Sequence, residues 1–222
     1  MWHWVILSAA LLLLLLTTSL LLWGQSREAP QAHPTLWRHH LLYGPRKFML
    51  QHGWGHLRPQ RCAELLRRLQ LECQRDHIEF CLSEGTALGA IRDQEFIAGD
   101  TDVDVALWPR DFAVFRTATL PRLLRNQGFV LLKDRQEEQG LRYGLVTLGW
   151  QGETLDVGAL FPGGYCCTRP GPCDEVIPHL QRWQRARLGQ DEYWVPGEEL
   201  LVALYGPDWR TPRTREKPQE IG

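Results

Sequence analysis

The chain has little of several features that mark particular kinds of protein. Its single asparagine, Asn126, is followed by Gln and Gly, so the sequence has no N-x-[ST] site for N-glycosylation. Lys and Arg total 25 against 26 for Asp and Glu, a formal net charge of -1. Nucleic-acid-binding domains usually carry a basic surplus, so this balance argues against nucleic acid as a partner.

The cysteines form no C-x-x-C pair, and the "CCTRPGPC" cluster contains no histidine. This spacing disfavours a zinc site. The number of cysteines is even, which is compatible with an oxidising lumen and with disulfide bonds. The sequence leaves their pairing open. The six cysteines are Cys62, Cys73, Cys81, Cys166, Cys167 and Cys173.

Residues 4–23 lack any charged side chain, and the run is long enough to cross a bilayer, which takes roughly 20 apolar residues. Trp2, Trp4 and Trp23 bracket it as interfacial anchors do. The run exceeds the apolar core of a cleaved signal peptide, about 7 to 15 residues, and no A-x-A site follows it. We therefore expect residues 1–24 to be an uncleaved signal-anchor of a single-pass type II protein, with its body in the lumen of the ER or Golgi.

The rest of the chain divides into two regions. Residues 25–57 are rich in His, Pro, Arg and Trp without a sustained period, which is typical of a stem. Residues 58–222 alternate helical and strand-like patterns, which predicts a mixed α/β domain with a central sheet flanked by helices. The helices are expected at 59–76, 83–93, 109–128 (kinked or divided at Pro121) and 196–205. The strands are expected at 77–82, 100–107, 129–134, 141–150 and 153–161.

Three aspartates, Asp100, Asp102 and Asp104, alternate with other residues in "GDTDVDVAL". A strand of that sequence would direct all three carboxylates to one face. Two such carboxylates roughly 6 to 7 Å apart repel each other by about 2.5 kcal/mol at an effective dielectric constant near 20. A hard divalent cation, Mg²⁺ or Mn²⁺, would relieve the repulsion and bridge the oxygens to phosphate.

The acidic segment has two other interpretations. A solvent-facing edge strand uses acids to deter unwanted strand pairing. A calcium loop would use Asp100, Asp102, Asp104 and Asp111 at positions 1, 3, 5 and 12, but Val105 occupies the position that needs glycine. The calcium loop is therefore rejected, and the edge strand remains open.

The neighbouring residues favour phosphate chemistry. Gly85 and Thr86 lie at a predicted strand-to-helix turn, where backbone N–H groups and a hydroxyl would face an anion. Arg92, later in the same helix, would add a positive charge. Asp156, in "ETLDVGAL", is the candidate third acid on an adjacent strand.

Two segments resemble the LicD/fukutin family, which has a nucleotidyltransferase-like fold. "EGTALGAIRDQEFIAGDTDVDVAL" is similar to the family's G-T/S-x-L-G-x-x-R and D-x-D segment, and "VPGEELLVALYGPDWRTPR" to its C-terminal signature. The resemblance spans roughly residues 59–213. The chain departs from the family in having Ala98-Gly99-Asp100 where Pro-Trp-Asp is common, and in lacking the large N-terminal domain of fukutin-type enzymes.

The resemblance implies a transferase that moves ribitol phosphate or phosphocholine from a CDP-linked donor to a glycan hydroxyl and releases CMP. By position, the family's metal-binding pair falls on Asp102 and Asp104, and its phosphate-contacting turn on Gly85 and Thr86. Asp156 takes the third acid's place, as metal ligand or base. Two alternatives stay open: a non-catalytic lumenal glycan-binding or accessory protein, and a transferase that uses another nucleotide-linked donor.

Overall fold

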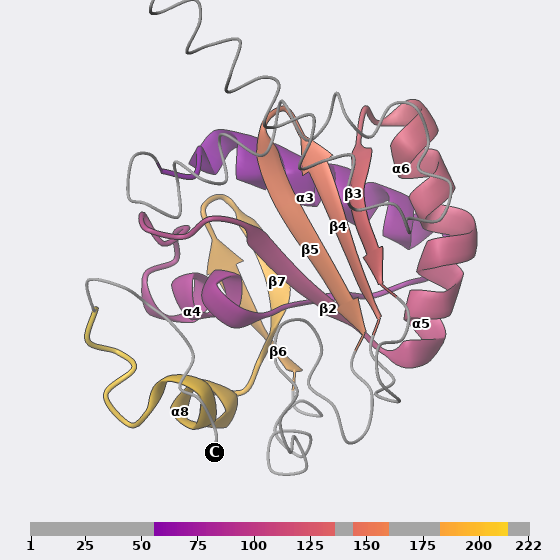
Figure 1. The fold of residues 1–222 in the computed structure, drawn as a ribbon. Helices are drawn as coiled ribbons and strands as arrows, with labels where there is room; N and C mark the ends of the chain where they lie inside the picture. The colour runs from indigo at the N-terminus through magenta and orange to yellow at the C-terminus, as the bar shows by residue number, and fades with distance from the viewer. Residues whose placement is uncertain (1–55, 136–143, 160–182, 213–222) are drawn as a thin grey trace, which may run out of the picture. The chain divides into compact units, whose positions relative to one another are not determined.

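The computed structural model describes residues 56–135, 144–159 and 183–212 (Figure 1). Backbone contacts divide the chain into two units, residues 1–36 and 37–222, and every described residue belongs to the second. The predicted signal-anchor, almost all of the predicted stem and the "CCTRPGPC" cluster lie outside the described residues. Within the part that is described, no helix is both long and apolar enough to cross a membrane.

The described strands form one mixed sheet in the order β3-β4-β5-β2-β1-β7-β6 (Figure 1). β2 pairs in parallel with β5, and β1 with β7, while the other neighbouring pairs are antiparallel. Helices pack against this sheet, so the predicted mixed α/β class is confirmed. The strands are β1 (Cys81–Leu82), β2 (Val103–Leu107), β3 (Val130–Arg135), β4 (Leu145–Trp150), β5 (Glu153–Ala159), β6 (Trp183–Leu188) and β7 (Asp191–Pro196).

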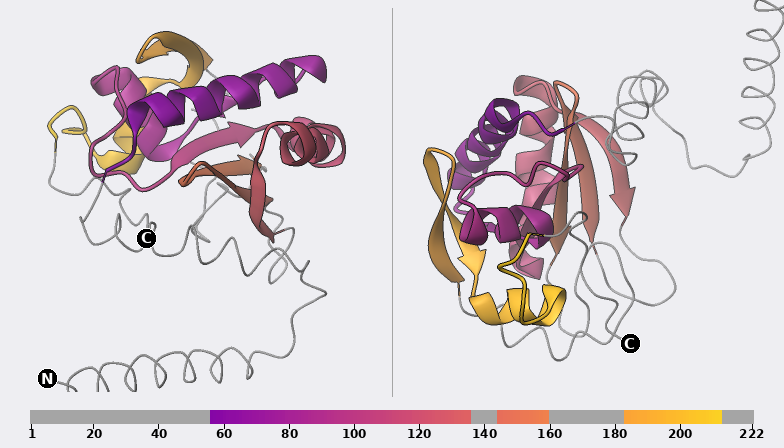
Figure 2. Two further views of the ribbon diagram at one scale, coloured as in Figure 1. Left: turned by 90° about the horizontal axis from the view of Figure 1, so that it is seen from above. Right: turned by 90° about the vertical axis from the view of Figure 1, so that its left-hand side faces the viewer.

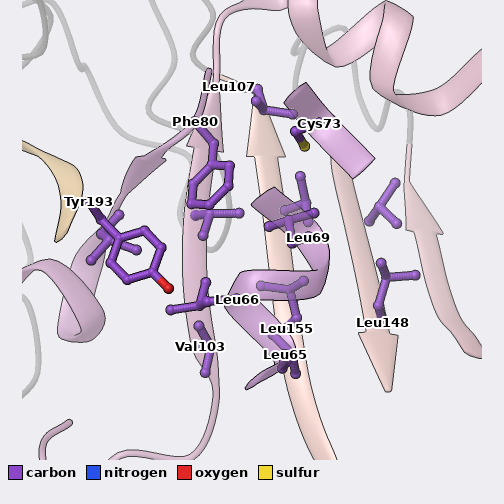
Figure 3. Packing of buried hydrophobic residues seen from close by; sticks show 14 of the residues in the cluster. Leu65, Leu66, Leu69, Cys73, Phe80, Val103, Leu107, Leu148, Leu155 and Tyr193 are labelled. Atoms are coloured by element: carbon purple, nitrogen blue, oxygen red, sulfur yellow. The ribbon is translucent and has the colours of Figure 1, made fainter. Parts of the chain in front are cut away.

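Helix α3 (Pro59–Arg75) lies along one face of the sheet (Figure 2). Its apolar residues recur at helical spacing, so they share one side of the helix. Leu65, Leu66 and Leu69 are buried among strand residues that include Val103 and Leu155 (Figure 3). Each fully buried side chain of this size contributes about 1.5–3 kcal/mol, so α3 is a main source of the domain's stability.

The predicted helix from Pro109 contains a π-helical turn before Pro121. It consists of α5 (Pro109–Val114), a π-helical turn η1 (Phe115–Thr119) and α6 (Leu120–Asn126). Proline has no backbone N–H, and its ring clashes with the carbonyl four residues earlier. A widened turn just before the proline accommodates both effects, so the helix continues through Pro121 and is not divided there.

Helices α4 (Glu84–Arg92) and α8 (Glu198–Tyr205) supply a second apolar cluster. Val103 and Val105 of β2 pack in the cluster that contains α3, whereas Ala106 packs with Leu88 of α4 and with leucines of α8. Alternate residues of a strand point to opposite faces. Asp104, which lies between the two valines, therefore faces the same side as Ala106.

The sequence patterns missed the β6–β7 hairpin and overestimated β1, which has two residues rather than six. The hairpin turns at Gly189, which has a φ of 63°, a backbone conformation that glycine adopts without strain. β6 lies at the sheet edge, and most of its side chains are exposed. It therefore lacks the apolar alternation by which strands are recognised.

The described cysteines lie in the core. Cys73 and Cys81 are buried thiols, and burial raises the pKa of both. Cys62, which lies on α3 as Cys73 does, is also buried. Disulfide bonding of Cys73 and Cys81 receives no support, and the remaining three cysteines fall outside the described residues.

Candidate active site

Asp104 and Asp156 stand opposite each other on adjacent strands. β2 and β5 are parallel, and their register pairs the two residues directly. Paired residues of neighbouring strands direct their side chains to the same face of the sheet. Both are buried, each with only 7% of its surface exposed. The structure therefore brings the predicted third acid next to the predicted acidic pair.

The interpretation of the acids as an edge-strand device is wrong. β2 is the central strand of the described sheet, with β5 on one side and β1 on the other. A central strand has no open edge to protect. All five of its residues are buried, so the carboxylate of Asp104 lies in an interior position and is not a solvated surface group.

Asp100 and Asp102 do not lie on the strand, contrary to the prediction of three acids on one strand. β2 begins only at Val103. The N–H of Thr101 donates to Asp100 Oδ1 at 2.9 Å, and the Thr101 hydroxyl donates to Asp102 Oδ1 at 2.9 Å. Such local side-chain bonds compete with strand pairing, which explains why the strand starts later than the alternating pattern suggests.

The predicted phosphate turn lies against these acids. The N–H of Asp104 donates to the Thr86 hydroxyl oxygen at 2.9 Å, which ties the first turn of α4 to β2. A Cβ atom placed on Gly85 would collide with Asp100 Oδ2. Gly85 therefore lets the acidic loop approach the helix closely, a contact that no other residue type permits without movement.

Electrostatics identify one more acid in this group. Burial raises the pKa of Asp104 well above its usual range, and the nearby charges of Asp102, Glu84, Asp100 and Asp156 raise it further. Each neighbour disfavours the ionised form of Asp104. These five residues, which we call the acid cluster, therefore gather like charges around Asp104, which either a proton or a bound cation would offset.

Glu84 was not among the sequence candidates. It is the first residue of α4, and its φ of 44° places it in the left-handed region, which residues other than glycine rarely adopt. Strained backbone of this kind collects at functional sites. The sequence signal was present as an acid directly before Gly85, but only the structure shows that its charge acts on Asp104.

Arg92 is at the other end of α4. At a rise of 1.5 Å per residue it lies about 9 Å beyond Thr86 along the helix axis. Its guanidinium, 6% exposed, forms an ion pair with Asp93 at 2.8 Å and donates to the Trp209 carbonyl at 3.5 Å. The structure therefore does not bring Arg92 to the turn but links it to the C-terminal segment.

The donor atoms of the acid cluster fit a hard divalent cation. Carboxylate oxygens are the ligands that Mg²⁺ and Mn²⁺ prefer, and a buried Asp104 among like charges is stabilised as an anion by a cation. In the described ranges, no group of three or more His, Cys, Asp and Glu side chains is already arranged around a single metal position. The fit therefore rests on donor chemistry and charge.

A separate cavity of about 80 Å³ lies beside β7. The Trp194 indole N–H donates to Glu79 Oε1 at 3.2 Å, and the Arg185 guanidinium stands 4.0 Å over the Trp194 ring. None of its lining residues belongs to the acid cluster. The cavity is not part of the candidate active site.

Comparison with known proteins finds a family match over part of the chain. Residues 77–148 match the family model described as "LicD/FKTN/FKRP, nucleotidyltransferase domain". The predicted resemblance to the LicD family is confirmed over this segment, which is less than half of the chain; members of that family are generally transferase-like. The match contains the Gly-Thr turn and the D-x-D pair, whereas Asp156 lies beyond it.

The other comparisons add little. No curated protein that was compared with the chain matches it. Among solved structures, the crystal structure of ANT(2")-Ia in complex with adenylyl-2"-tobramycin is similar at 17% identity and a TM-score of 0.32. The similarity covers 43% of this chain and 48% of that one, about half its length. A likeness of this size carries no argument about function.

Proposed function

We propose that this chain is a metal-dependent phosphotransferase. It moves a phospho-alcohol, of the ribitol phosphate or phosphocholine type, from a CDP-linked donor to a glycan hydroxyl and releases CMP. The observation that carries the proposal is the register of Asp104 with Asp156, beside a helix whose Gly-Thr turn is bonded to Asp104. The family match supports the transferase class.

The acids and the turn have separate roles in this proposal. Asp102, Asp104 and Asp156 hold Mg²⁺ or Mn²⁺, which neutralises charge on the donor diphosphate and on the leaving CMP. The N–H groups of Gly85 and Thr86, in the first turn of α4, donate to a phosphate oxygen. The Thr86 hydroxyl oxygen accepts from Asp104, so its own proton is available for the same phosphate.

The transfer step exchanges one P–O bond for another. The acceptor hydroxyl oxygen attacks the phosphorus that bears the alcohol, and the bond to the CMP oxygen breaks. The acceptor's proton passes to Asp156, which faces the same side of the sheet as Asp104. Arg92 adds positive charge from the far end of α4; because it already pairs with Asp93, its contribution acts through the field rather than by contact.

The setting of the enzyme is also proposed. Residues 1–24 anchor it as a single-pass type II protein, and the domain works in the lumen of the Golgi or ER, where glycan acceptors are exposed. The apolar run supports this placement because it is uncharged over a bilayer's length.

The test is thermal unfolding of the full-length chain in mild detergent. It is measured with Mn²⁺ and with CMP, CDP, UDP, GDP and the CDP-linked forms of choline, ribitol and glycerol. We expect a rise in Tm that needs both metal and a cytidine nucleotide, and CMP release when a glycan acceptor is added. Asp102→Asn with Asp104→Asn should abolish the rise, whereas Asp134→Asn, which removes a surface acid paired with Arg116, should not.

The alternative outcomes are distinct. No shift with any nucleotide in a folded sample would favour a non-catalytic accessory protein. A shift with UDP or GDP alone would keep the transferase but replace its donor.

A further inference from the structure

Ser83 lies directly between β1 and α4, beside the acid cluster. Its N–H donates to the Asp104 carbonyl at 3.0 Å, and its side chain is 3% exposed. β1 pairs with β2 in the register Leu82↔Val105. The next antiparallel pair in this register is Ser83 with Asp104. The Ser83 hydroxyl and the Asp104 carboxylate therefore face the same side of the sheet.

The Ser83 hydroxyl has no hydrogen-bond partner among the described residues. Serine at the residue before a helix normally accepts a hydrogen bond from an N–H of the first turn. Here no side-chain cap bond forms. Buried hydroxyls are almost always bonded, and one that is not calls for a ligand or a functional explanation.

The Ser83 side chain thus leaves the first turn of α4 uncapped. The N–H groups of this turn carry partial positive charge. The hydroxyl is a neutral donor beside five carboxylates, so it adds a hydrogen bond to an anion without changing the charge that a cation must balance. A phosphate oxygen is the ligand that both features recognise.

We infer that Ser83 is a substrate-binding residue whose hydroxyl donates to a phosphate oxygen of the nucleoside-diphosphate-linked donor. The inference rests on the proposed function. It extends the phosphate site from Gly85 and Thr86, in the first turn of α4, to the residue directly before that helix. Within the described residues this hydroxyl has no partner, and in this inference its bond forms when the donor binds. The unbonded Ser83 hydroxyl therefore lowers the stability of the ligand-free protein but increases its affinity for the donor.

The test is Ser83→Ala in the full-length chain. Removal of an unbonded buried hydroxyl should leave the ligand-free Tm unchanged or raise it. The KM for the CDP-linked donor should rise roughly tenfold to a hundredfold, as for loss of a hydrogen bond to a charged group, and the Tm increase with Mn²⁺ and donor should shrink. Ser83→Cys, which keeps the size but is a weak donor, should give an intermediate KM.

Tyr193→Phe is the matched control. The Tyr193 hydroxyl is also buried without a hydrogen-bond partner in the described residues, but it lies in the core near Leu66 (Figure 3). The ring stays stacked on Phe80. This variant should match Ser83→Ala in ligand-free Tm and leave the donor KM as in the wild type.

Two results would overturn the inference alone. One is a donor KM for Ser83→Ala equal to that of the wild type; the other is a clear fall in its ligand-free Tm, which would show that the hydroxyl has a structural partner. Failure of the proposed function looks different, because the wild type itself would then show neither a nucleotide-dependent Tm rise nor CMP release. That result would remove the inference together with its premise.

Discussion

The backbone N–H of Asp104 donates to the side-chain hydroxyl of Thr86 at 2.9 Å, and both residues are buried. The helix with the phosphate turn is thereby fixed to the strand with the central acid. Thr86→Val keeps the shape but leaves the Asp104 N–H without its acceptor. We expect the free energy of unfolding to fall by about 1–3 kcal/mol, measured by urea denaturation. Thr86→Ser keeps the hydroxyl, so its free energy of unfolding should fall by clearly less than that of Thr86→Val. Equal losses in the two variants would contradict a role for this hydrogen bond.

The raised pKa of Asp104 makes a prediction about pH. Burial and neighbouring acids raise it in the folded state, so the folded protein binds a proton that the unfolded chain, with a pKa near 3.9, has already lost. The metal-free protein should therefore lose stability as pH rises from about 4 to the raised folded pKa, and level off above it. Unfolding in urea with a chelator, measured across that range, gives the profile.

Asp104→Asn tests whether Asp104 causes this dependence of stability on pH. The variant cannot ionise, so its stability should depend less on pH in this window and exceed that of the metal-free wild type at neutral pH. A variant that is less stable than the wild type at pH 7 would show that the native carboxylate is ionised and paired, and would refute the prediction.

The sequence predicted those features whose signal is local. The apolar spacing of α3 marks one buried face, and Pro121 marks an irregular helix, which the structure shows as the π-helical turn before it. The closeness of the Gly-Thr turn to the D-x-D pair also followed, because the segments are separated by few residues. Each prediction rests on a period or a backbone restriction that acts within a few residues.

The rest of the site depends on contacts between distant segments. Asp156 was a candidate from its pattern, but its register with Asp104 is set by pairing of β2 with β5. Ser83 gave no signal of its own, and Glu84 only that of an acid before Gly85, since the importance of both comes from their position beside Asp104. β6 was missed because an exposed, charged edge strand lacks the alternation that identifies strands.

The pKa of a second buried acid, Glu72, is lowered, whereas that of Asp104 is raised. It is fully buried on α3 and accepts hydrogen bonds from Arg122 at 2.9 Å and Gln127 at 2.8 Å. Burial acts to raise the pKa of its carboxyl, but these donors and the charge of Arg75 bring the pKa below its usual value. The ionised form therefore holds α6 against α3.

Glu72→Gln should lower the free energy of unfolding by about 1–3 kcal/mol at neutral pH, because the buried Glu72 carboxylate loses its charge-assisted bond with Arg122, which keeps its ion pair with Asp76. A lowered folded pKa gives stability that is present above the unfolded pKa and is lost as pH falls through the folded one. The difference between variant and wild type should therefore shrink in acid. Urea unfolding at pH 7 and at pH 3 measures it; a difference that is unchanged at pH 3 would assign the loss to packing.

Gly85 and Gly99 give a matched pair of substitutions around the acidic loop. A Cβ on Gly85 would meet the carboxylate of Asp100, whereas a Cβ on Gly99 would meet nothing within 4 Å. Gly85→Ala should therefore displace Asp100, lower the Tm and weaken the shift with Mn²⁺ and nucleotide, and Gly99→Ala should leave both as in the wild type.

The double variant Gly85→Ala with Asp100→Ala isolates the cause. If the collision with Asp100 is responsible, removal of that carboxylate restores the Tm of the metal-free protein, so the two substitutions are non-additive as expected for residues in contact. The ligand shift should recover only in part, because Asp100 is one of the charges that act on Asp104. Additive losses of stability would show instead that alanine at position 85 disturbs the first turn of α4 itself.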